Sequence, residues 1–193
     1  MMRMRDIPVV GHCLRAGAKA AAGAGIVAEF GVYRGTTIRQ LANMFPDEDV
    51  YGFDSFVGLP EPWVRSETSV YPAGRFSLGG QMPDVPQNVL LVPGWFHEAL
   101  PAFLDVVARP FKLMHIDCDL YSSTKTLLAL CRARIVPGTV LVFDELCDWS
   151  ESGRYPAWPE GEYRALVESG LRFRPLARDN RFALAIQIEE TAA

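Results

Sequence analysis

The stretch FKLMHIDCDLYSST, residues 111–124, decides the fold class because an apolar run in it ends abruptly at two aspartates. The run 111–116 has the length and the nearly continuous apolar character of a strand buried on both faces, which is typical of parallel sheets. Asp117 and Asp119 follow at its end. Because an unpaired buried carboxylate is costly, their position indicates a site where the negative charge is used.

Similar short apolar runs recur along the chain, and segments with helical periodicity lie between most of them. We expect strands at 26–32, 50–53, 89–92, 111–116, 140–143 and 182–188, a weaker one at 171–176, and helices at 36–45, 96–107 and 124–134. Strands that alternate with helices predict an α/β fold, a mostly parallel sheet with helices on both faces. Only a turn at 178–181 precedes the last strand, so we expect that strand to run antiparallel.

The composition is that of a single globular domain spanning 1–193. Hydrophobic residues make up 49% of the chain, and the net charge is −4. No basic stripe interleaved with aromatic residues is visible, so we expect no binding to nucleic acid. The four cysteines show no CxxC spacing and no histidine at zinc-site spacing, and a domain of this size does not need disulfides, which indicates reduced thiols in a cytoplasmic protein.

Three segments fall outside the strand–helix pattern. Residues 1–25 predict a short N-terminal helix, and the charges that interrupt it argue against a membrane span or a signal peptide. Residues 60–87 form a long loop rich in proline and glycine, of the kind that serves as a lid or binding loop. Residues 148–159 are similar but shorter. Their Trp149, Tyr155 and Trp158 fit an acceptor pocket, the packing of the loop or a dimer contact equally well.

Acidic residues stand at the carboxyl ends of the expected strands, where ligands bind in open α/β sheets. Asp54 follows the second strand, where an acid either accepts the hydroxyl groups of a ribose or caps a turn. The loop GVYRG, residues 31–35, is wider than the glycine-rich loop that cradles a pyrophosphate. The sequence therefore favours a nucleoside without phosphates, and S-adenosylmethionine is the obvious one.

A second group of acids follows the strands at 111–116 and 140–143. Neighbouring parallel strands lie about 4.8 Å apart, so Asp117, Asp144 and Glu145 can converge on one point. Hard oxygen donors of this kind favour Mg²⁺ or Ca²⁺ over zinc, and Asp119 stays close enough to act as a general base. The alternative is a set of exposed acids that face solvent or pair with arginines.

Five segments resemble the macrocin O-methyltransferase family, whose members methylate sugar hydroxyls on macrolide and aminocoumarin antibiotics. They are EFGVYRGTTI (29–38), VYGFDSFVGLPEP (50–62), VPGWFHEALP (92–101), HIDCDLYSST (115–124) and PGTVLVFDE (137–145). The resemblance implies the Rossmann-like class I methyltransferase fold with seven strands. It also implies an S-adenosylmethionine-dependent, magnesium-dependent O-methyltransferase that acts on a hydroxyl of a sugar or another natural-product intermediate.

The resemblance further implies roles for individual residues. Asp54 would bind the ribose, Glu29 and Gly31 would lie beside the methionine part of the cofactor, and Trp95 and Phe96 would lie near the adenine. The full cofactor-binding set would be Glu29, Gly31, Tyr33, Arg34, Thr36, Thr37, Asp54, Ser55, Gly94, Trp95, Phe96 and Asp117. Asp117, Asp144 and Glu145 would be the Mg²⁺ ligands, and Asp119 would be the catalytic base.

Two departures from the family affect these expectations. The family usually has a second aspartate where this chain has Glu145, which either ligates the metal or faces the substrate instead. The family also has a longer N-terminal portion, so the acceptor pocket here is expected to be more open, or completed by 60–87 or by a second subunit. The competing functions are another metal-dependent reaction on the same fold and a non-catalytic domain that binds S-adenosylmethionine.

Several polar residues near these motifs have simpler explanations. His97 and His115 are each isolated, and such a histidine is more often structural or exposed than catalytic. Ser122 and Ser123 lie at the start of a helix, where capping is more common than catalysis.

Overall fold

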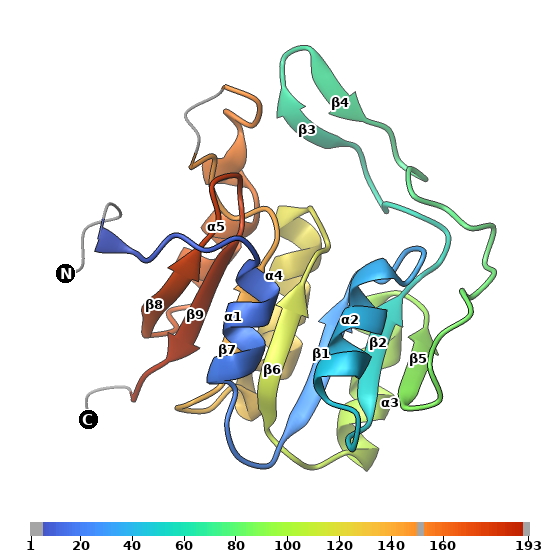
Figure 1. Cartoon of the computed structure of the whole chain (residues 1–193). Coiled ribbons are helices and arrows are strands. Elements are labelled where there is room, and N and C mark those ends of the chain that lie inside the picture. The colour runs from blue at the N-terminus through green and yellow to red at the C-terminus, as the bar shows by residue number, and fades with distance from the viewer. Residues whose placement is uncertain (1–5, 150–152, 191–193) are drawn as a thin grey trace.

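A seven-stranded sheet forms the centre of the computed structural model, which describes residues 6–149 and 153–190 (Figure 1). Its order is β5-β2-β1-β6-β7-β9-β8. The strands are β1 (Ile26–Phe30), β2 (Val50–Asp54), β5 (Val89–Pro93), β6 (Phe111–Ile116), β7 (Val140–Phe143), β8 (Phe173–Arg178) and β9 (Leu184–Ile188). β1, β2, β5, β6 and β7 pair in parallel, whereas β9 runs antiparallel to both of its neighbours. The expected sheet, with its last strand antiparallel, is confirmed.

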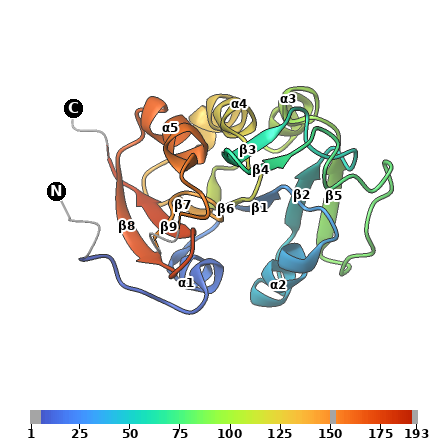
Figure 2. The ribbon, with the colours of Figure 1, turned by 90° about the horizontal axis from the view of Figure 1, so that it is seen from above.

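Helices cover both faces of this sheet (Figure 2). On one face lie α1 (Cys13–Ala20) and α2 (Thr36–Met44); on the other lie α3 (Phe96–Val106), α4 (Tyr121–Cys131) and α5 (Glu162–Glu168). Short 3₁₀ helices occupy Arg132–Arg134 and Trp158–Glu160. The expected helix at 1–25 is thus limited to Cys13–Ala20 among its described residues. No helix in the described part of the chain has the length and apolar character to cross a membrane.

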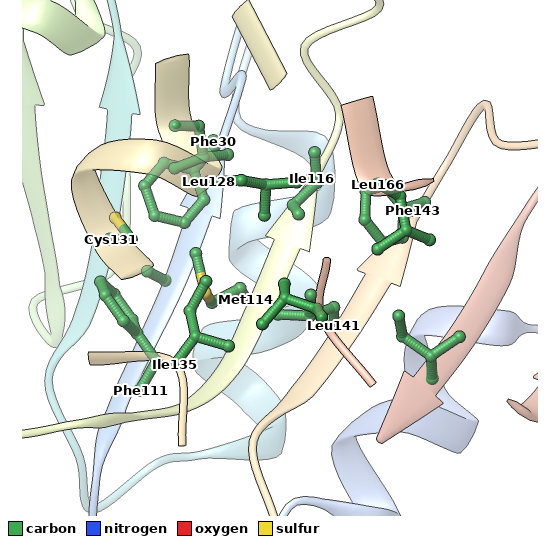
Figure 3. Close-up of a cluster of buried hydrophobic side chains, with 14 of the residues drawn as sticks. Phe30, Phe111, Met114, Ile116, Leu128, Cys131, Ile135, Leu141, Phe143 and Leu166 are labelled. Atoms are coloured by element: carbon green, nitrogen blue, oxygen red, sulfur yellow. The ribbon is translucent and has the colours of Figure 1, made fainter. Parts of the chain in front are cut away.

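The core has one apolar cluster on each side of the sheet. Figure 3 shows the cluster under α3, α4 and α5, where Phe30, Met114 and Phe143 from three strands meet Leu128 and Leu166 from two helices. All five of these side chains are buried. Because both faces of β1, β6 and β7 are covered, each of these strands is apolar along its length, with few exceptions.

Two elements were absent from the expected pattern. The segment 60–87 contains an antiparallel hairpin, β3 (Trp63–Ser66) and β4 (Ser69–Tyr71). These strands are too short to show a periodic pattern. Helix α5 was also missed, because at Glu162–Glu168 it is too short for a helical repeat to stand out.

Candidate active site

A cavity of about 640 Å³ opens at the carboxyl edge of the parallel strands. It is lined by Gly31, Tyr33, Asp54, Ser55, Gly58, Leu59, Pro60, Trp63, Arg65, Tyr71, Phe76, Gly94, Trp95, Phe96, His97, Asp117, Cys118, Asp119, Ser122, Ser123, Thr126 and Glu145. These residues come from the ends of β1, β2, β5, β6 and β7, from the segment that contains the hairpin, and from the starts of α3 and α4. This is the edge where the α/β rule places a ligand.

Asp54 shapes the loop that forms one wall of the cavity. Its Oδ2 atom accepts hydrogen bonds from the backbone N–H groups of Val32 (2.8 Å) and Tyr33 (2.7 Å), and its Oδ1 atom accepts one from Phe56 (2.7 Å). The carboxylate therefore fixes both the loop after β1 and the turn after β2. Asp54 thus has the turn-capping role that its position after β2 allowed. Since each carboxylate oxygen accepts two hydrogen bonds, Oδ1 can also accept one from a ligand hydroxyl.

Gly31 brings this loop against the end of β6. Its φ is +96°, and a Cβ atom on it would lie 1.9 Å from the carbonyl oxygen of Asp117. The Gly31 N–H donates to the carbonyl of Phe53. Only glycine fits between these two strand ends, so the residue type at this position follows from the close approach of the backbones.

Strained backbone is concentrated at the cavity. Tyr33, Phe56, Phe76 and Asp119 have positive φ values of 48–68° although none of them is glycine. Tyr33, Phe76 and Asp119 line the cavity. Non-glycine residues in this region cost energy and collect at binding and catalytic sites.

The acids after β6 lie in a poorly solvated, negatively charged environment. Burial, and then repulsion from Asp144 and Asp119, raise the pKa of Asp117 well above its usual value. Burial, and then Asp144, also raise the pKa of Asp119 to about 7, although the nearby Arg65 acts to lower it. A carboxyl group with a pKa near neutral is suited to accept a proton from a substrate.

Glu145 contacts an arginine of the hairpin. Its Oε2 atom lies 3.4 Å from an Nη atom of Arg65, and both side chains are largely buried. Burial raises the pKa of Glu145 to about 8, because the desolvation of the carboxylate outweighs the attraction of Arg65. The expectation that the acids pair with arginines therefore holds for this residue.

The three expected Mg²⁺ ligands do not form a metal site in this arrangement. In residues 6–149 and 153–190, no group of three or more His, Cys, Asp or Glu side chains is placed to hold a metal ion. Asp117 and Asp144 follow paired strand ends, and the Asp144 N–H donates to the carbonyl of Ile116. These two acids fit a hard cation by position and donor type. Glu145 contacts Arg65 through its Oε2 atom, and its role as a metal ligand stays a prediction.

Five expected site residues are not among the described residues that line the cavity. Glu29 is fully buried, accepts a hydrogen bond from the Thr37 hydroxyl (2.6 Å) and lies 3.5 Å from Nδ1 of His115. It therefore supports the loop after β1 from behind. Arg34 and Thr36 are exposed, and so is Asp144. Contact of these residues with a cofactor or metal stays a prediction.

Sequence reasoning missed much of the cavity wall. The segment 60–87 contributes Pro60, Trp63, Arg65, Tyr71 and Phe76, and its length and composition were the signal. The wall also includes Ser122, Ser123 and His97. Neither serine caps α4, whose N-cap is Leu120 without a side-chain bond, and Ser122 instead donates to Glu61.

The aromatic residues of 148–159 pack the loop. Tyr155 is buried and accepts a hydrogen bond from Trp63 Nε1 (3.3 Å), Trp149 donates to the carbonyl of Ala183, and Trp158 packs edge-on against Tyr163. None of the three belongs to the described cavity lining.

Glu162, at the first turn of α5, is a further buried acid that the sequence did not indicate. Its side chain is fully buried, its Oε1 atom lies 3.9 Å from the Cys118 thiol, and its Oε2 atom has no hydrogen-bond partner among residues 6–149 and 153–190. Burial, and then the charges of Asp119 and Glu145, raise its pKa well above the usual value. Burial and the neighbouring acids therefore favour the protonated, neutral form of Glu162 behind the cavity.

The sheet order, the glycine at the first loop and the acid after β2 are those of a class I, S-adenosylmethionine-dependent methyltransferase. A protein-family model described as a methyltransferase domain matches residues 28–146. The chain belongs to this methyltransferase family.

Solved structures show the same fold. The calicheamicin methyltransferase CalS11 superposes with a TM-score of 0.71 and 24% identity over 90% of this chain and 76% of that chain. The O-methyltransferase NovP superposes with a TM-score of 0.57 and 21% sequence identity, over 92% of this chain and 77% of that chain. An O-methyltransferase from Bacillus cereus in complex with SAH superposes with a TM-score of 0.56 and 15% sequence identity, over 96% of this chain and 86% of that chain. None of the curated proteins compared with this chain matches it in sequence.

Proposed function

We propose that this protein transfers a methyl group from S-adenosylmethionine to a hydroxyl group of a small natural-product intermediate, in the cytoplasm. The proposal rests on the family and on the cavity at the carboxyl edge of the sheet. Support for an oxygen acceptor comes from similar folds, which include CalS11, described as a TDP-rhamnose 3'-O-methyltransferase, and NovP.

The cavity divides into two ends according to its residues. Asp54, Ser55, Trp95 and Phe96 lie at the ends of β2 and β5 and would hold the nucleoside. Gly31, which lines the cavity at the end of β1, would lie beside the methionine part. Asp119 and Glu145, which follow β6 and β7, would hold the acceptor together with the hairpin.

Asp119 is the proposed general base. It lines the cavity, and with a pKa of about 7 it is partly ionised at neutral pH. The carboxylate would take the proton from the acceptor hydroxyl as the oxygen attacks the methyl group of the sulfonium. Holding the two reactants in line would supply much of the acceleration.

We further propose that Asp117 and Asp144 hold Mg²⁺. When bound, the ion would lower the pKa of the acceptor hydroxyl and offset the repulsion among the acids. Because Glu145 pairs with Arg65, two protein ligands are proposed in place of three, and Mg²⁺ commonly keeps several waters.

The single observation that carries the proposal is the convergence of Gly31, Asp54 and Asp119 on one cavity. Its test is transfer of isotope-labelled methyl from S-adenosylmethionine to a panel of sugars, nucleotide sugars and phenolic glycosides. Transfer that falls at least 100-fold in Asp119→Asn, with binding of S-adenosylhomocysteine retained, supports the proposal. Transfer that is unchanged in this variant would show that Asp119 is not the base.

A further inference from the structure

Arg65 is held among aromatic rings on the hairpin. Its guanidinium carbon lies 4.8 Å from the centre of the Trp63 ring, 5.0 Å from that of Tyr155 and 4.9 Å from that of Phe182. Only 15% of the Arg65 side chain is exposed. Three rings from separate segments therefore restrict where this side chain can point, and each contributes a cation–π attraction.

The backbone at this position is anchored as well. The Arg65 carbonyl accepts a hydrogen bond from the Ala157 N–H at 3.2 Å. Trp63, two residues before Arg65, donates to the Tyr155 hydroxyl and stacks on Tyr71 of β4. The side chain and the backbone of Arg65 are thus both fixed relative to the loop that follows β7.

The partner of this fixed guanidinium is Glu145, eighty residues further along the chain. The contact uses Oε2 of Glu145, and the residue also lines the cavity, so its Oε1 atom can accept a hydrogen bond there. Among the described cavity-lining residues, Arg65 is the only arginine or lysine. No other described side chain of the wall brings a permanent positive charge to this acidic end.

We propose that Arg65 is a positioning residue, which holds the Glu145 carboxylate toward the acceptor so that Glu145 binds an acceptor hydroxyl instead of a metal ion. The inference rests on the proposed function, and it adds a requirement for the acceptor. The acceptor carries a second hydroxyl next to the methylated one, because Glu145 follows β7 beside the end of β6, where Asp119 serves the reacting oxygen.

The first test separates Glu145 from the metal ligands by measuring binding of MnCl₂ with electron paramagnetic resonance. Asp117→Asn is expected to weaken Mn²⁺ binding at least tenfold, whereas Glu145→Gln changes it less than twofold. An equal loss in both variants would overturn the proposal, since it would make Glu145 a ligand. A wild-type protein that binds S-adenosylhomocysteine but no Mn²⁺ refutes the magnesium proposal alone and agrees with a non-ligating Glu145.

The second test uses the acceptor found in the methyl-transfer screen. Arg65→Met keeps an apolar side chain among the rings and is expected to raise KM for the acceptor at least fivefold, with S-adenosylhomocysteine affinity unchanged. Because Arg65 also acts to lower the pKa of Asp119, kcat is compared at pH 9, where it should stay within threefold. Arg65→Lys keeps the charge and is expected to recover part of the loss. Arg75→Met is the matched control, because Arg75 lies over Tyr71 and Phe76 without contact to Glu145 in the described structure.

A double variant shows whether Arg65 acts through Glu145. If it does, Arg65→Met combined with Glu145→Gln raises KM no more than Glu145→Gln alone. Additive losses would overturn the positioning role and would indicate that Arg65 contacts the acceptor directly. A folded wild-type protein that does not bind S-adenosylhomocysteine would instead refute the proposed function.

Discussion

The Oδ2 atom of Asp54 accepts a hydrogen bond from the Tyr33 N–H at 2.7 Å, so the end of β2 determines the shape of the loop after β1. This relationship links the fold to the cavity, because both residues line it. A change at Asp54 is therefore expected to affect ligand binding and the order of the loop together.

Asp54→Ala removes the acceptor of three backbone hydrogen bonds. Hydrogen bonds to charged groups contribute about 1.5–3 kcal/mol each, and part of this is recovered by water, so we expect the free energy of unfolding to fall by about 2–4 kcal/mol. S-adenosylhomocysteine affinity should fall at least tenfold in calorimetry. Asp47→Ala, at an exposed aspartate, is the control, and equal effects in both variants would contradict a specific role of Asp54.

Gly31→Ala places a Cβ atom against the Asp117 carbonyl, which is backbone and cannot move aside. We expect the free energy of unfolding to fall by at least about 3 kcal/mol, from the strained φ and the collision together. Gly138→Ala is the matched control, since Gly138 also has a positive φ (93°) but no atom lies within 4 Å of its added Cβ. Urea unfolding of both variants measures the difference, and similar losses would rule out the collision as its cause.

The buried acids make stability depend on pH in the metal-free protein. Asp119 and Glu145 have pKa values raised to about 7 and about 8, whereas in the unfolded chain they lose their protons near pH 4. The unfolded state therefore binds fewer protons between these limits, and the free energy of unfolding falls as the pH rises from 5 to 8, by roughly 6 kcal/mol when the two groups titrate independently. Urea unfolding in EDTA measures this change.

Asp119→Asn should flatten this pH dependence, because the asparagine has no proton to lose. Addition of MgCl₂ to the wild-type protein at pH 8 should restore stability if the ion binds between the acids. Wild-type stability that rises from pH 5 to pH 8 in EDTA would contradict the burial of protonated carboxyl groups.

Glu162→Gln tests the charge behind the cavity. The glutamine is neutral at every pH and keeps the size of the side chain, so repulsion with Asp119 and Glu145 is removed. We expect a higher urea midpoint at pH 8 and little change at pH 5. Glu67→Gln is the control at an exposed glutamate. A lower midpoint for Glu162→Gln at both pH values would indicate that this carboxyl group is needed as a structural partner.

The sheet was predictable from the sequence because its strands are covered on both faces. Because both faces are covered, residues 140–143 are apolar throughout and residues 111–116 are apolar except for Lys112 and His115. β6 and β7 have these bounds in the structure. The acids at the strand ends were predictable for a related reason, since carboxyl ends of parallel strands meet at one edge. Ten of the expected site residues line the cavity: Gly31, Tyr33, Asp54, Ser55, Gly94, Trp95, Phe96, Asp117, Asp119 and Glu145.

The remaining parts of the site depend on contacts between distant segments. The Arg65–Glu145 pair spans eighty residues, and a short hairpin without periodicity carries its arginine. Whether Glu145 ligates a metal or faces the substrate was open in the sequence, because both roles require only a carboxylate after β7. The position of Arg65 in the folded protein favours the second role.

Calorimetric titration of the wild-type protein with S-adenosylhomocysteine tests the central claim most directly, because it asks whether the cavity beside Gly31 and Asp54 holds the cofactor product. We expect one molecule bound per chain with micromolar affinity, an affinity at least tenfold weaker in Asp54→Ala, and an unchanged affinity in Asp119→Asn. Absence of binding at millimolar concentration, by a wild-type protein shown to be folded, would contradict it.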